Sequence, residues 1–241
     1  MHQVRLRPRQ GGFTLAELAI VLVVLTVLAG ALVIPFRGQL ELRQRQRTEA
    51  LLADARAALI GFAAVHGRLP CPATQTDPAN PAYGQESIDA ISGNCVVATE
   101  GMLPWRTLAL SPIDAWGQPR KAPTEPWTGH FRYRVDTGFS RVTPRIAPDT
   151  PYGDEIKVVD HNGGAITVST YSGADALKNT VAVALVYSTG PDLAANGQNA
   201  SYEPGADATY EQGEPTPGFD DMVTWIGRPQ LIARMAEAGG L

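Results

Sequence analysis

The sequence predicts an α+β fold in which a long N-terminal helix is packed on a small antiparallel sheet with long loops. Two observations lead to this prediction. An apolar run that begins at Phe13 passes directly into an amphipathic segment ending near His66, and this succession predicts one long helical region. Strand-like runs come only afterwards, among most of the 24 glycines and 19 prolines, which favours short strands joined by many turns.

Length and charge limit the function classes. At 241 residues, the chain has room for one sizeable domain and an N-terminal segment. Its formal net charge is −4, and the sequence shows no basic patch of the kind that replaces counterions along phosphates. We therefore expect no nucleic acid among the partners.

The chain divides into four segments. Residues 1–12 contain three arginines and no acid, as expected of a targeting leader that is removed by cleavage. Residues 13–35 are almost entirely apolar, and about 22 helical residues span roughly 33 Å, enough to cross a bilayer. An amphipathic stalk helix is expected over 36–67 and a globular domain over 68–241.

Glu17 is the one acid inside the apolar run. A carboxylate in a membrane segment costs on the order of 3 kcal/mol, so it needs a partner. No Lys, Arg or His lies between Phe13 and Ile34. Cleavage after Gly12 would create an α-amine on Phe13, four residues before Glu17 and on the same helix face. A cut there would supply the missing partner.

The stretch "GGFTLAELAIVL" resembles the N-terminus of the prepilins and pseudopilins of type IV pili and type II secretion systems. The shared features are a short basic leader, Gly-Phe, Thr-Leu, an acid at the fifth position after the cut, and a long apolar helix. The resemblance implies cleavage after Gly12 by an inner-membrane prepilin peptidase and N-methylation of Phe13. It also implies that Glu17 contacts the free amine of a neighbouring subunit in a filament. Pro35 stands one residue later than in most such helices.

Two other interpretations of this segment remain open. Glu17 could lie at the membrane interface of an uncleaved signal anchor. Alternatively, Ala29 to Ala31 could be an ordinary signal-peptidase site whose cleavage releases a soluble periplasmic protein.

Cys71 and Cys95 predict one disulfide. A targeting leader implies export, and exported chains with an even number of cysteines usually form disulfides. The bond would close a loop of about 25 residues and contribute roughly 3 to 4 kcal/mol. Two unpaired thiols in a reducing compartment are the alternative.

The remaining elements are expected after a long loop over 69–101. Gly30, Pro35 and Gly38 mark positions at which the N-terminal helix could kink, so that the stalk would be interrupted. The expected elements are a strand at His130–Val135, an Asn-Gly hairpin over 155–170, a central strand at Thr180–Ser188, a strand over 221–227 and a short helix at Pro229–Gly239.

A second resemblance concerns the globular domain. The string "DAWGQP" followed by "FRYRV" is similar to the Asp-x-Trp-Gly-x-Pro turn and aromatic strand of major pseudopilins. Those proteins carry a calcium-binding loop after the equivalent of the strand at 180–188. Here "STGPDLAANGQN" and "GFDDMVTW" stand in the matching order, which nominates Asp192, Asn196 and Asp220 or Asp221 as calcium ligands.

The charge pattern of this region agrees with a cation site but does not require one. Residues 179–227 contain no Lys or Arg, and crowded carboxylates repel one another unless a hard cation such as Ca²⁺ relieves the repulsion. A merely solvated acidic loop is the alternative. Ca²⁺ is thus the only candidate cofactor.

No nucleophile elbow, zinc motif, phosphate loop or dinucleotide fingerprint is visible, so we do not expect an enzyme. The prediction is a structural subunit, a pseudopilin or minor pilin, that crosses the bacterial inner membrane once, with its C-terminal domain in the periplasm, before it enters a pilus or pseudopilus. Expected partners are the prepilin peptidase, other subunits, an inner-membrane assembly platform and the lipid bilayer. The alternative is a membrane-tethered periplasmic ligand- or calcium-binding module that does not polymerise.

Overall fold

The computed structural model describes residues 14–97, 99–117, 129–168, 180–201 and 208–241, without the side chains of 29–37. The predicted leader, Gly12 and Phe13 lie outside the described residues. The chain forms two compact units, residues 1–44 and residues 45–241. The second is called the globular unit here.

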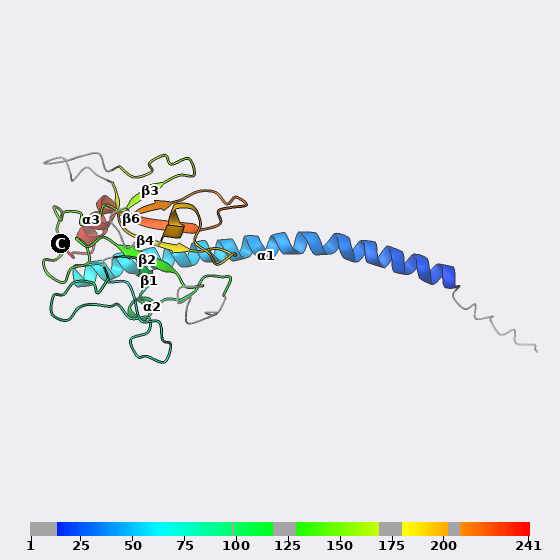
Figure 1. Cartoon of the computed structure of the whole chain (residues 1–241), viewed down its shortest axis with the longest axis horizontal. Helices are drawn as coiled ribbons and strands as arrows, with labels where there is room; N and C mark the ends of the chain where they lie inside the picture. Colours follow the sequence, from blue (N-terminus) through cyan, green and yellow to red (C-terminus); the bar gives the residue numbers. More distant parts are fainter. Residues whose placement is uncertain (1–13, 98, 118–128, 169–179, 202–207) are drawn as a thin grey trace, which may run out of the picture. The chain divides into compact units, whose positions relative to one another are not determined.

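One helix, α1 (Leu15–His66), covers both predicted helical segments (Figure 1). The backbone is helical through Pro35, where an interruption was expected, because a proline removes only one donor from the ladder while the turns on either side keep theirs. The helix ends at His66, where the end of the amphipathic segment was predicted. Gly67 has a left-handed φ of +69°, and its N–H donates to the Ala63 carbonyl at 2.8 Å.

The main sheet is antiparallel, with strand order β1-β2-β4-β6. Its strands are β1 (Gly101–Met102), β2 (Arg132–Val135), β4 (Ala182–Ser188) and β6 (Met222–Gly227). Strand β4 lies between β2 and β6, and all seven of its residues are buried. The prediction of a central strand in this apolar run is confirmed, as is the strand predicted over 221–227.

The hairpin predicted over 155–170 is confirmed only in part, because its arms pair over a short stretch and β3 has a second partner. Strand β3 (Lys157–Val159) pairs in parallel with β5 (Thr209–Glu211), and the two form a separate sheet. The expected turn does form, since the Asp160 N–H donates to the Gly164 carbonyl at 2.8 Å.

The return arm of this turn does not continue as a strand in the described residues. Its Ile166 N–H donates to the Val158 carbonyl at 2.9 Å, whereas the Val158 N–H donates to the hydroxyl Thr167 Oγ1 at 3.0 Å rather than to a carbonyl. The arm contributes an isolated bridge between Val159 and Ala165, and its last residues, 169 and 170, lie outside the description.

Among the described residues, two large hydrophobic clusters lie on the two faces of the main sheet, and a smaller one is formed by Ala73, Met102 and Trp105. On one face, α1 and α3 (Arg228–Glu237) pack against the strands, and α3 corresponds to the predicted C-terminal helix. The buried face of α1 recurs every three or four positions, at Thr48, Leu52, Ala55, Leu59 and Ala63. Strands β3 and β5 cover the other face. The remaining elements are α2 (Trp105–Leu108) and the 3-10 helix η2 (Gly197–Ser201).

Candidate functional site

Thr14 and Glu17 form a reciprocal cap at the start of α1. Glu17 Oε2 accepts hydrogen bonds from the Thr14 N–H at 2.9 Å and from the Thr14 hydroxyl at 3.1 Å. The Glu17 N–H donates back to Thr14 Oγ1 at 3.3 Å. This is a capping box, which satisfies N–H groups that have no carbonyl partner in the first turn. Oε1 accepts no hydrogen bond from any described residue, so it can take a further donor.

The turns that follow Glu17 present a continuous apolar surface. Every Leu, Ile and Val side chain from Leu15 to Leu28 is exposed by 50% to 90%. Among the residues that the structure describes, no helix is both long and apolar enough to cross a membrane. An exposed apolar surface of this extent marks a site of interaction with lipid or with another protein.

The four candidate calcium ligands lie together in one loop cluster. The Asp192 N–H donates to Asp220 Oδ2 at 3.3 Å, and the Asn196 N–H donates to Asp221 Oδ2 at 2.9 Å. In return, the Asp220 N–H donates to Asn196 Oδ1 at 2.9 Å. The structure therefore brings the two separate stretches of sequence, around 192–196 and 220–221, into direct contact.

Several side-chain oxygens of this cluster already accept hydrogen bonds from the loop that follows β4. Asp192 accepts the Ala194 N–H at 2.8 Å and the Asn196 side-chain amide at 3.2 Å. In contrast, the Oδ1 atoms of Asp220 and Asp221 are buried and have no hydrogen-bond partner among the described residues. Burial raises the pKa of Asp221 to about 7. The pKa of Asp220 is also raised, mainly by burial and to a smaller extent by the negative charge of Asp192. A buried carboxylate in this state needs a proton or a cation.

The chemistry of the cluster suits a hard cation only in part. Carboxylate oxygens are ligands that Ca²⁺ prefers, and Asp220 and Asp221 each offer one unpartnered oxygen. Within the described ranges, however, no group of three or more His, Cys, Asp or Glu side chains is arranged to hold a metal ion.

Two residues that the sequence did not single out hold this cluster in shape. Asn199, 1% exposed, donates to Asp221 Oδ2 at 2.9 Å and accepts the Glu211 N–H at 2.8 Å. Gly190 has a φ of +64°, and a Cβ there would lie 2.6 Å from the Asp220 carbonyl oxygen. A glycine two residues after a predicted strand was the available signal for Gly190, whereas Asn199 had none.

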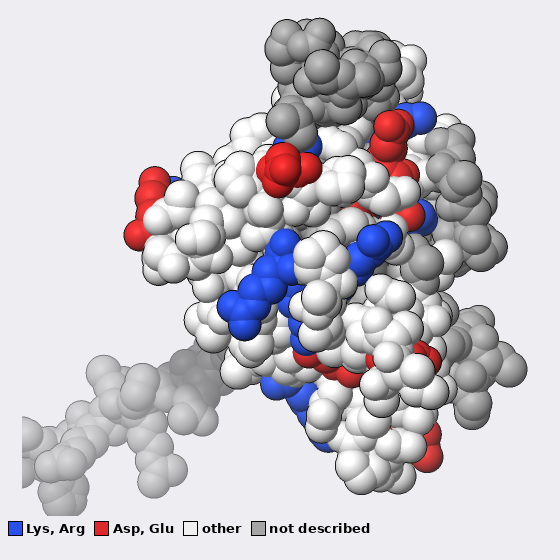
Figure 2. All heavy atoms as spheres, turned by 90° about the vertical axis from the view of Figure 1, so that its left-hand side faces the viewer, with Lys and Arg blue, Asp and Glu red and all other residues white. Residues whose placement is uncertain are grey.

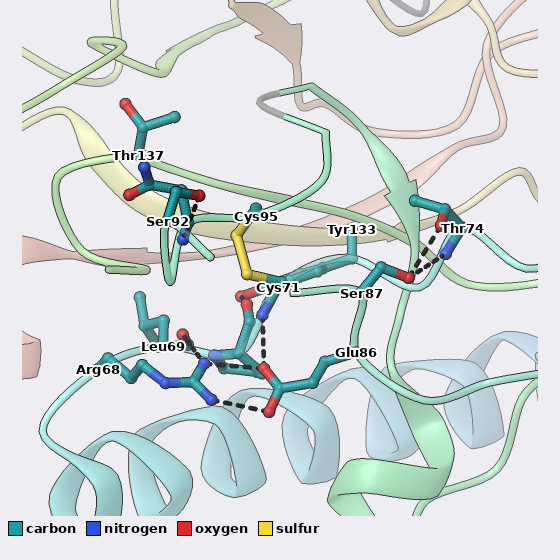
Figure 3. The surroundings of a disulfide bond; sticks show 12 residues. Arg68, Leu69, Cys71, Thr74, Glu86, Ser87, Ser92, Cys95, Tyr133 and Thr137 are labelled. Atoms are coloured by element: carbon teal, nitrogen blue, oxygen red, sulfur yellow. Dashed lines mark hydrogen bonds and ion pairs between the residues drawn. A yellow bond between two sulfur atoms is a disulfide. The ribbon is translucent and has the colours of Figure 1, made fainter. Parts of the chain in front are cut away.

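Cys71 and Cys95 form the predicted disulfide (Figure 3). Glu86 lies beside it, where one carboxylate accepts the Cys71 N–H at 3.0 Å and two bonds of 2.8 Å from the Arg68 guanidinium. The Tyr133 hydroxyl donates to the Pro70 carbonyl at 2.9 Å. The loop after α1 is therefore fastened both to the end of that helix and to β2.

The "DAWGQP" turn joins the sheet to α1. Asp114 Oδ2 accepts the Ser188 hydroxyl at 2.6 Å, and the Ala115 N–H donates to Thr48 Oγ1 at 3.2 Å. Burial raises the pKa of Asp114. The last part of the string, from 118, lies outside the described residues. The contacts found are structural, and none requires chemistry.

A buried charged group lies between the main sheet and β5. Glu100 pairs with Arg132 and accepts the Tyr187 hydroxyl at 2.7 Å and the Tyr210 hydroxyl at 2.8 Å. Burial, with the neighbouring charge of Glu100, raises the pKa of both phenols well above the ordinary tyrosine value.

His161, at the tip of the 160–164 turn, joins that turn to the β5–β6 connection. Its Nδ1 lies 2.7 Å from Glu211 Oε1, its Nε2 lies 2.7 Å from the Glu214 carbonyl oxygen, and its ring packs edge-on against Phe219. The hydrogen bond to Glu211 raises the pKa of His161. The His161 side chain therefore holds the 160–164 turn against the β5–β6 connection.

Comparison with known proteins identifies the N-terminal segment. Residues 7–33 match the family model described as the prokaryotic N-terminal methylation motif, which contains Gly12, Phe13 and Glu17. Such a motif implies a membrane-anchored N-terminal segment and processing by a prepilin peptidase. No curated protein and no solved structure matches the chain. The likeness of the globular domain to major pseudopilins therefore stays a prediction.

Proposed function

Because residues 7–33 carry the N-terminal methylation motif of the type IV prepilin-like family, we propose that the chain is the precursor of a filament subunit. The subunit would be a pseudopilin or minor pilin of a type II secretion pseudopilus or a type IV pilus. The motif, with its acid at Glu17, is the observation that carries the proposal. The proposal assigns the chain no reaction of its own.

The proposed mechanism is assembly from the bacterial inner membrane. Prepilin peptidase cuts after Gly12, and Phe13 is N-methylated. The apolar start of α1 then stays in the lipid bilayer, with the globular unit in the periplasm, until an inner-membrane platform moves it into the filament. The capping box supports a role for Glu17 in this step, because Thr14 holds Oε2 while Oε1 accepts no hydrogen bond from the described residues and so can take the amine of a neighbouring subunit.

The mature N-terminus tests the first step. Edman sequencing of the protein purified from its native host should begin at Phe13, with a methylated amine. A start at Leu32 would instead indicate a signal-peptidase product, and a start at Met1 an uncleaved anchor; either result rejects the proposal.

The Glu17→Ala variant separates a filament subunit from a membrane-tethered module. A filament subunit should be processed normally but lose assembly, whereas a tether should tolerate the change. Glu49→Ala, at an exposed position of the same helix, is the matched control. Assembly that is equal in both variants would favour the tether.

A second candidate function, calcium binding, rests on the two buried and unpartnered carboxylate oxygens of Asp220 and Asp221. Bound Ca²⁺ would neutralise these carboxylates and fix the loop between β4 and η2 against the start of β6. Thermal unfolding should therefore shift upward with millimolar Ca²⁺ relative to chelator in the wild type, and the shift should be absent in Asp221→Asn. An unchanged wild-type midpoint would exclude a calcium site.

A further inference from the structure

The globular unit has one end that is basic and apolar. At the end of α1, the Ile146 N–H donates to the Gly67 carbonyl at 2.8 Å, and the aliphatic stem of Arg145 lies so close to Gly67 that a Cβ there would come within 2.7 Å of it. The Val142 N–H donates to the Gly93 carbonyl at 3.1 Å. These anchors fix the segment that presents Arg141 and Arg145, which is called the basic end here.

The two arginines of the basic end are exposed, and their side chains make no hydrogen bond or ion pair with any described residue. Val142 between them is 45% exposed, and residues 137–148 contain no acid. Viewed toward the end at which α1 stops, the unit shows Lys and Arg side chains near the middle of this face, with acidic side chains mostly toward its edges (Figure 2).

The opposite end of the unit carries a group of acidic residues. Ser188, at the end of β4, donates to Asp114, and the next residue, Ala115, donates to Thr48 near the start of the unit. Arg45 lies at this end as well, and its charge opposes the rise in the pKa of Asp220. The Asp192 N–H donates to the Asp220 carboxylate, so these two residues lie side by side. Glu214 lies in the β5–β6 connection, where its carbonyl oxygen contacts the His161 ring. The Glu214 carboxylate is exposed and has no partner among the described residues. Asp192, Glu214 and Asp220 are called the acidic end.

The two ends are separated along α1. Arg45 and Gly67 are 22 residues apart, which corresponds to about 33 Å of helix. One copy therefore cannot pair its own basic end with its own acidic end, whereas two copies stacked along α1 can. A contact between two different surfaces repeats from copy to copy without closing and so builds an open filament.

We propose that the basic end, through Arg141 and Arg145, docks on the acidic end of a second copy of this chain. The inference rests on the proposed function, because exposed ion pairs add little affinity and the helices must hold the copies together. The charged ends set the orientation and the register of neighbouring globular units.

Crosslinking between copies tests the contact directly. Val142→Cys and Pro215→Cys place reporter thiols beside the two ends and leave the charges in place. With a short bismaleimide, in membranes of the native host, the chain carrying both thiols should give a ladder of multimers, and each single variant should remain monomeric. Dimers from either single variant would show a two-fold contact and overturn the inference.

Charge exchange tests the cause of the contact. In the double-thiol chain, Arg145→Glu should reduce the ladder about tenfold, and addition of Glu214→Lys should restore it. Arg234→Glu is the control, because Arg234 is exposed on α3 and already pairs with Glu237. Each variant is first checked for an unchanged melting temperature. A ladder that does not respond to Arg145→Glu, or that is not restored, overturns the inference.

A third reporter distinguishes this inference from the proposed function. Val24→Cys, at an exposed position of the apolar part of α1, reports helix packing between copies. If Val24→Cys gives dimers but the double-thiol chain gives no ladder, the docking inference fails and the filament function stands. If neither reporter crosslinks, the docking inference fails, and the proposed function is then decided by the mature N-terminus and the Glu17→Ala variant.

Discussion

Removal of the disulfide should destabilise the globular unit by an amount that can be calculated from the loop it closes. The bond joins Cys71 and Cys95, which are 24 positions apart. Loop-closure entropy for about 25 residues gives about 3.5 kcal/mol at room temperature. For a unit of this size, that corresponds to a fall of about 7–14 °C in the melting temperature. The double variant Cys71→Ser with Cys95→Ser is the appropriate change, because it leaves no free thiol.

Thermal and denaturant unfolding of the full chain in detergent micelles measure the effect. If the bond acts mainly on the unfolded chain, its removal should cost the same whether or not Glu86, which braces Cys71 in the folded state, has been changed to Gln. A loss below about 1 kcal/mol, or a loss that vanishes in the Glu86→Gln background, would refute the entropic reasoning.

Three further predictions concern the globular unit. Glu100→Gln removes the carboxylate that pairs with the buried Arg132, so denaturant unfolding should show a loss of about 3–5 kcal/mol; a loss below 1 kcal/mol contradicts this. Gly190→Ala should cost about 1–3 kcal/mol from its positive φ and close contact, whereas Gly218→Ala, which has open space, should change stability by less than about 0.5 kcal/mol; equal effects would contradict the steric argument. Because the pKa of His161 is raised in the folded state, its stabilising bond to Glu211 is fully present below the unfolded value of about 6.5 and is lost as the pH rises through the folded pKa. The unfolding free energy of His161→Gln, measured across this range, should lack that decline, and an unchanged decline would assign it to another group.

The elements with strong local patterns could be predicted from the sequence. The helical character of both parts of α1, the central position of β4 and the C-terminal helix follow from periodicity and apolar character, whereas the interruption expected at Pro35 is not found. The pairing of β3 with β5 could not be predicted, because it joins residues about fifty positions apart and leaves no local pattern. A favoured turn at 160–164 indicated a local partner for β3, and that pairing is limited to a short stretch around Val159 and Ala165.

In the candidate sites, too, the features with a local sequence pattern could be predicted and the others could not. The order of acidic and amide residues around Asp192 and Asp221 was enough to group them, and the structure brings them together. The arrangement of individual oxygens was not predictable, because it depends on which backbone N–H groups each side chain meets after folding. Thr14 and Glu17 have the three-residue spacing of a capping box. The apolar surroundings of Glu17 indicated only a partner outside the helix, so the local bond to Thr14 was not predicted.

The absorbance of Tyr187 and Tyr210, which donate to Glu100, can report the local unfolding of the globular unit. Tyr187 and Tyr210 resist ionisation while they are buried, whereas a phenol in water ionises near its ordinary value. In strongly alkaline solution, tyrosinate absorbance from these two rings should therefore rise only as β5 separates from the main sheet. The rate of that rise is then a label-free measure of how often this buried layer is reached by solvent.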